Sequence, residues 1–172
     1  VKFASENRKV RVLPLLLKAT RGVGAKDVDD KNARLYLVRS LRRKSPTAMA
    51  RFKENYAQYL NDEEVMMLAA QADGTILKVV KNTDYINKRE FVTACLESYI
   101  VKLADGAILD GLNINLTYEQ AIIACRRDGR NYFYLSEEFK KIKEIAVNAV
   151  RSDESVYDRL SEELKNDADV IR

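Results

Sequence analysis

A six-residue motif occurs twice near the end of the chain, and this internal repeat constrains the fold more than any other feature. Residues 135–140 read LSEEFK and residues 160–165 read LSEELK, which is a spacing of 25 residues. A fixed internal period is typical of proteins that stack small structural units, because such units bury their apolar faces only against their neighbours. The repeat therefore predicts a stacked architecture.

Four segments extend this repeat towards the N-terminus. Each begins with a glutamate followed by apolar residues at helical spacing. The anchor residues near their ends are 25, 30 and 25 residues apart: Ala70, Cys95, Cys125 and Val150. The five extra residues fall where two Asp-Gly pairs, at 105–106 and 110–111, supply turn-forming residues. We expect the insertion to lie in a loop.

Each anchor is followed by a polar or glycine break and then by a second short apolar run. This pattern predicts one helical hairpin per unit. The second unit is the exception, because its apolar residues keep a helical spacing through Leu103 and predict one longer helix over 88–104. The predicted units are 61–83, 84–114, 115–139 and 140–165, with a truncated fifth unit at 166–172.

The pattern acidic-x-x-Val/Ile-x-x-Ala-Ala/Val, then Asp/Asn-Gly, then LSEELKND resembles an uncharacterised family, a domain of unknown function built of tandem short helix pairs. Residues 136–172 resemble it best, residues 61–135 loosely, and residues 1–60 not at all. The resemblance implies relatives among bacterial proteins, some of them suspected effectors, and among protist proteins. It implies no activity and no functional residues.

Residues 1–60 carry predicted helices in place of repeats. Apolar residues favour a helix over 8–20 and another over 30–43, in which Leu35, Val38 and Leu41 are expected to face inward. Ser45 and Pro46 predict the start of a further helix that ends near Leu60, since serine caps free N–H groups and proline needs no partner at the first helical position. We expect these helices to cap the stack; the alternative is a separate module docked to it.

Nothing in the sequence points to an enzyme. The chain has no histidine and no glycine-rich nucleotide loop, and its paired glutamates fall in the first turns of predicted helices, where capping and the helix dipole explain them. Cys95 and Cys125 are interpreted as small core residues; a disulfide or a metal pair is the alternative. We therefore predict no catalytic residue, no cofactor and no metal.

The composition is that of a soluble globular protein, with 33% charged and 47% hydrophobic residues. The apolar run at 12–17 is too short to span a bilayer, so no transmembrane segment is predicted. The chain opens at Val1 and stops inside the fifth unit, so we expect a fragment of a larger protein. The cysteine usage favours the cytoplasm, or a host cytoplasm if the protein is an effector.

Charge is unevenly distributed along the chain. Residues 1–60 hold 15 Lys or Arg against 5 Asp or Glu, a balance of +10, whereas residues 61–172 hold 15 against 21, a balance of −6. Such asymmetry indicates a charged partner. The candidate binding residues cluster around one predicted helix junction: Arg39, Arg42, Arg43, Lys44 and Arg51.

A second group of cations lies beside an aromatic run at 132–134. Arg126, Arg127 and Arg130 with these rings would suit phosphate contacts and base stacking; the alternative is that the rings belong to the core.

Taken together, these patterns predict an all-α protein of stacked short helical hairpins, solenoid-like repeats of about 25 residues behind an N-terminal helical cap. The expected function is a non-catalytic protein-interaction or scaffold module whose basic surface contacts an acidic partner protein. One alternative is a nucleic-acid-binding or anionic-lipid-binding domain using the same basic cluster. Another is a solvated face that offsets the acidic repeats.

Overall fold

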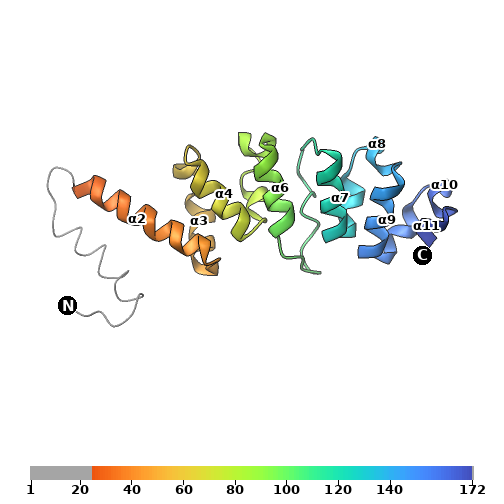
Figure 1. Cartoon of the computed structure of the whole chain (residues 1–172), viewed down its shortest axis with the longest axis horizontal. Helices are drawn as coiled ribbons and strands as arrows, with labels where there is room; N and C mark the ends of the chain where they lie inside the picture. Colours follow the sequence, from red (N-terminus) through yellow and green to blue (C-terminus); the bar gives the residue numbers. More distant parts are fainter. Residues whose placement is uncertain (1–24, 172) are drawn as a thin grey trace.

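Helices make up the regular structure of this protein. The structure, a computed structural model, describes residues 25–171; that part of the chain contains no strand, and its helices follow one another from one end of an elongated molecule to the other (Figure 1). The prediction of an all-α fold is confirmed. The predicted helix over 8–20 lies outside the described residues.

The first two helices of the described residues, α2 (Ala25–Arg42) and α3 (Pro46–Asn55), form a corner. The predicted start at Ser45 is confirmed, since its hydroxyl oxygen accepts a hydrogen bond from the N–H of Ala48 at 3.3 Å and Pro46 occupies the first helical position. α3 ends earlier than predicted and passes into a 3-10 helix, η1 (Tyr56–Tyr59), before the chain reaches α4.

Only the C-terminal half of α2 packs against the rest of the protein. Val38 and Leu41 are buried as predicted, but the expectation that Leu35 faces inward was wrong, because this side chain is 48% exposed. α2 contacts α3 and α4, and its N-terminal part projects beyond them (Figure 1). A residue one turn before Val38 therefore has no neighbouring helix to cover it.

Four ten-residue helices form the body of the molecule: α4 (Glu63–Ala72), α6 (Arg89–Ser98), α7 (Tyr118–Arg127) and α9 (Lys143–Ser152). Each contacts the next, so the helices stand in a row (Figure 1). Their first residues are 26, 29 and 25 positions apart. The predicted anchor spacing of 25, 30 and 25 is corrected by this register: Cys95 matches Ala124, whereas Cys125 matches Leu96 one position further along the helix.

Local chemistry explains where several of these helices begin. Thr117 and Gln120 form a capping box at the start of α7, in which each side chain accepts a hydrogen bond from the other residue's N–H. Asp62 caps α4 by accepting from the N–H of Val65 at 3.3 Å.

The second half of each unit is not the single helix of a hairpin. After α7 and α9 the chain forms a 3-10 helix and then one turn of α-helix. The elements are η3 (Gly129–Tyr134) with α8 (Glu137–Lys140), and η4 (Glu154–Arg159) with α10 (Glu162–Lys165). The repeated LSEE motif builds this feature twice, because Ser136 and Ser161 cap the short helices and the preceding leucines are buried.

The first unit uses different elements in its second half, and a short helix ends the array. α4 is followed by α5 (Ile76–Val79) and the 3-10 helix η2 (Asp84–Asn87). α11 (Ala168–Ile171) packs against α9 with Val170 buried.

The prediction of one helix over 88–104 was wrong. α6 ends at Ser98, and Tyr99 has extended backbone angles, φ −67° and ψ 145°. This conformation directs the Tyr99 ring into the core, where its hydroxyl accepts a hydrogen bond from Asn131 Nδ2 at 2.9 Å. From Tyr99 to Thr117 the chain forms no helix, so this unit lacks a second half of the kind seen after α7 and α9.

The helices α2 and α3 share one core with the helices that follow them. Val38, Leu41, Met49 and Phe52 belong to the same buried apolar cluster that runs through to Val170. An ion pair reinforces this packing, since Arg34 of α2 donates to Asp62 at the start of α4 across 2.7 Å.

This ion pair predicts a pH-dependent stability. The hydrogen bond from Arg34 holds the pKa of Asp62 below its ordinary value. A carboxyl with a depressed folded pKa stabilises the fold fully above its unfolded pKa of about 4, and the stabilisation disappears as the pH falls through the lower folded value. We expect Asp62→Asn to unfold at a lower urea concentration than the wild type at neutral pH, and the gap to narrow below pH 4.

The matched control for Asp62→Asn is Asp158→Asn, which changes an exposed carboxylate on η4. This control should leave the urea midpoint unchanged at both pH values. A gap for Asp62→Asn that stayed constant between pH 7 and pH 3 would contradict the role of the ionised carboxylate.

Candidate functional site

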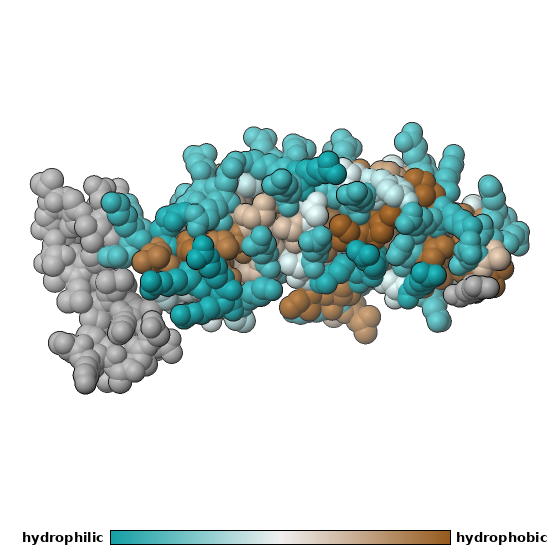
Figure 2. Space-filling model, in the orientation of Figure 1, coloured by the Kyte–Doolittle hydropathy of each residue, from teal (hydrophilic) through white to brown (hydrophobic). Residues whose placement is uncertain are grey.

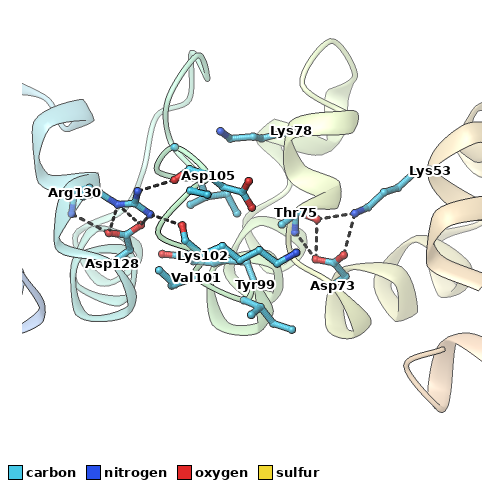
Figure 3. Close-up of a pocket in the computed structure, with 14 residues that line it drawn as sticks. Lys53, Asp73, Thr75, Lys78, Tyr99, Val101, Lys102, Asp105, Asp128 and Arg130 are labelled. Atoms are coloured by element: carbon cyan, nitrogen blue, oxygen red, sulfur yellow. Dashed lines mark hydrogen bonds and ion pairs between the residues drawn. The ribbon is translucent and has the colours of Figure 1, made fainter. Parts of the chain in front are cut away.

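A groove of about 650 Å³ opens where the second unit lacks its second half. Figure 3 shows its two walls: Lys53, Asp73 and Thr75 on the side of α3 and α4, and Asp128 with Arg130 on the side of α7. The segment that follows α6, from Tyr99 to Asp105, lies between these walls.

The first wall is a closed set of hydrogen bonds around Asp73. Its carboxylate accepts from Lys53 Nζ at 2.9 Å and from the N–H and hydroxyl of Thr75 at 3.0 and 2.7 Å, while Lys53 also donates to the Thr75 hydroxyl at 2.8 Å. Burial raises the pKa of Asp73, but these donors outweigh it and hold the pKa below its ordinary value. Asp73 is therefore ionised at neutral pH and neutralises Lys53.

The second wall fixes the loop that crosses the groove. Arg130 pairs with the buried carboxylate of Asp128 at 2.7 Å and donates to the backbone oxygens of Lys102 at 3.2 Å and Asp105 at 2.6 Å. Arg127 donates to the backbone oxygen of Tyr99 and lies over its ring. Two of the predicted binding residues, Arg127 and Arg130, thus hold the segment that follows α6.

Asn131 is the central polar residue behind the groove, and the sequence analysis did not single it out. Its side chain is fully buried and makes three hydrogen bonds. Nδ2 donates to the Tyr99 hydroxyl and to the Ala124 oxygen, both at 2.9 Å, and Oδ1 accepts from the N–H of Leu109 at 3.2 Å. The only sequence feature that could have indicated this role is the position of Asn131 three residues after Asp128.

Three charges in the groove remain without an ion pair within residues 25–171: Lys78, Lys102 and Asp105. Because Lys53 and Arg130 are offset by Asp73 and Asp128, the balance is one positive charge. The groove is therefore suited to an acidic ligand.

The predicted basic cluster lies at the α2–α3 junction, and we call its five residues the basic corner: Arg39, Arg42, Arg43, Lys44 and Arg51. All five side chains are exposed. Arg42 pairs with Glu64 across 3.7 Å, and the other four make no ion pair in the part of the chain that the structure describes. Lys44 has a φ of 55°, which turns the backbone sharply between α2 and α3.

The aromatic run does not form one stacking surface. Tyr132 is buried and donates from its hydroxyl to the Lys140 oxygen at 2.5 Å, Phe133 is half-buried under Arg159, and Tyr134 is exposed. Of the three nearby cations, Arg126 is exposed and, unlike Arg127 and Arg130, its side chain makes no hydrogen bond or ion pair among the described residues. The interpretation that these rings belong mainly to the core is favoured.

Both cysteines are buried and free. Burial raises the pKa of the Cys125 thiol to about 12 and raises that of Cys95 as well. The thiols are thus protonated at neutral pH and act as small core side chains, as predicted. No helix among the described residues has the length and apolar character needed to cross a membrane.

The fold defines a class, an all-helical protein whose described helices follow one another along the chain and pack against their neighbours. Within it, residues 118–165 match a family described as a domain of unknown function, DUF4116. The matched segment begins with α7 and ends with α10, so it covers the two units whose second halves are alike. Comparisons with curated proteins and with solved structures found no match.

Proposed function

We propose that this chain is a non-catalytic protein-interaction module, a solenoid-like array whose basic corner contacts an acidic segment of a partner protein. The observation that carries the proposal is the exposure of five cations at one helix junction, only one of which is ion-paired within the described residues. Exposed, unneutralised charges of one sign steer and select an oppositely charged partner.

Two features favour a protein over a nucleic acid. The second predicted cation group is largely engaged internally, since Arg127 and Arg130 hold the segment after α6. Beyond the corner the chain carries a balance of −6 over residues 61–172. A nucleic-acid duplex is a long rod with one negative charge per roughly 1.7 Å. A duplex lying along the array would be repelled by the negative charge of residues 61–172, whereas a short acidic peptide at the basic corner would not reach it.

The test is charge reversal at the corner. The double variant Arg39→Glu with Arg43→Glu leaves the Arg42–Glu64 pair intact. It should weaken binding of a fluorescently labelled glutamate-rich peptide by about tenfold or more, because it removes several charge contacts that are each weakened by solvent screening. Binding is measured by fluorescence anisotropy. The matched control is Lys81→Glu with Lys141→Glu, which makes the same change in net charge at exposed positions outside the corner.

Only a loss of peptide affinity that occurs in the corner variant and not in the control variant supports the proposal. Equal affinity of the wild type and the corner variant would show that the corner is a solvated face. An equal loss in the control variant would show that only net charge matters.

A further inference from the structure

The groove beside α6 contains a stretch of backbone whose polar groups are unused. Among the described residues, the N–H groups of Ile100, Val101 and Lys102 donate no hydrogen bond, and the oxygens of Ile100 and Val101 accept none. All three residues are exposed at the surface. They are available to the backbone of another chain.

Apolar side chains accompany this free backbone. Ile100 is 71% exposed and Leu103 is 95% exposed. Figure 2 shows an apolar patch protruding from the lower middle of the molecule, where Figure 1 places the connection between α6 and α7. Large exposed apolar residues gathered in one place mark a contact surface more often than scattered ones do.

Charge selects the kind of ligand that would fit here. Lys78 from α5 and Lys102 from the segment after α6 both line the groove, and Asp105 offsets one of them. A simple anion would use the lysines alone. A peptide with carboxylates and apolar side chains would use the lysines, the free backbone and the apolar surface together.

We propose that this groove binds an acidic peptide segment in extended conformation, whose carboxylates contact Lys78 and Lys102 and whose backbone hydrogen-bonds to Ile100 and Val101. Extended peptides commonly gain affinity from unpaired main-chain groups and specificity from side-chain contacts. The volume of about 650 Å³ lies within the range of ligand-binding clefts. This site is separate from the basic corner and goes beyond the proposed function.

The probe is a blocked peptide in which glutamate and valine alternate over about eight residues, enough at roughly 3.3 Å per residue to cross the groove. Titration into the ¹⁵N-labelled protein should shift the amide signals of Ile100, Val101 and Lys102. Lys78→Glu with Lys102→Glu should weaken binding by about tenfold or more. Asp105→Asn should tighten binding, because it removes the opposing charge.

Two controls separate this site from the corner. The basic-corner variant Arg39→Glu with Arg43→Glu should bind the alternating peptide as the wild type does and still show the same shifted amides. The surface variant Lys81→Glu with Lys141→Glu should also bind normally. Loss of binding in either control to the same extent as in the groove variant would overturn the proposal.

The backbone contribution is tested with the same peptide N-methylated at every residue, which keeps its charge and removes its backbone N–H donors. We expect a loss of about tenfold, since the methylated peptide cannot donate these hydrogen bonds to the backbone oxygens of the groove. Equal binding of the methylated peptide would overturn the proposal, as would no binding by either peptide. Retention on phosphatidylserine vesicles that Ile100→Asp abolishes, without peptide binding, would assign the patch to a membrane surface and overturn it as well.

Discussion

Gly74→Ala is expected to destabilise the fold by about 3 kcal/mol or more, because among the glycines of residues 25–171 it is the one where an added methyl group would meet the closest backbone contact. A Cβ at position 74 would lie 1.8 Å from the backbone oxygen of Cys95 and 2.7 Å from the N of Tyr99. Both contacts are to backbone, so no side-chain rotation relieves them. The variant has to separate α4 from α6, which are packed against each other here.

The measurement for Gly74→Ala is urea unfolding followed by circular dichroism. Gly106→Ala is the matched control, because its Cβ would meet only the side chain of Asp110 at 3.4 Å. We expect this control to stay within about 0.5 kcal/mol of the wild type. A free energy of unfolding for Gly74→Ala within the same margin would contradict the close approach of α4 and α6.

Asn131→Leu is expected to cost about 2–4 kcal/mol although leucine has nearly the same size. The substitution leaves the N–H of Leu109 and the hydroxyl of Tyr99 without their buried partner, whereas the Ala124 oxygen keeps a bond from the N–H of Asp128. The second unit depends on this residue, since it ties the segment after α6 to α7 and η3. Amide exchange at Leu109 should therefore become faster.

Asn148→Leu provides the comparison for Asn131→Leu. Within residues 25–171, Asn148 donates only to the oxygen of Glu144 in its own helix, so its replacement should change the free energy of unfolding by less than about 0.5 kcal/mol. Equal stability of the Asn131 and Asn148 variants would show that the buried amide contributes nothing specific.

Features set by neighbouring residues could be predicted from the sequence. Ser45 before Pro46, Thr117 with Gln120, and the serine of the repeated LSEE motif each place a capping side chain three positions before the backbone N–H that donates to it. The helix starts at these positions follow from that local chemistry.

Features set by distant residues could not be predicted. The end of α6 depends on burial of Tyr99 against Asn131, 32 positions away, and the apolar spacing through Leu103 gives no sign of it. The register of Cys95 was wrong by one position because small residues occupy adjacent positions in these helices. Sequence spacing brings Arg127 and Arg130 close together, but it does not reveal that backbone oxygens of the segment after α6 already occupy them.

The basic corner could be placed at one junction from the sequence because its residues are consecutive or nearly so. Their exposure follows from the short turn between α2 and α3, which leaves both helix ends at the surface. The nature of the partner rests on the charge distribution of the whole chain, and it can be tested directly.

The most direct test of the proposed function compares two labelled ligands, a glutamate-rich peptide and a mixed-sequence RNA duplex, by fluorescence anisotropy at about 50 mM and about 200 mM salt. We predict that the peptide binds more tightly than the duplex at both salt concentrations and that Arg39→Glu with Arg43→Glu weakens only the peptide measurably. Tighter binding of the duplex, falling by about a thousandfold between the two salt concentrations, would instead show that the basic corner contacts phosphates.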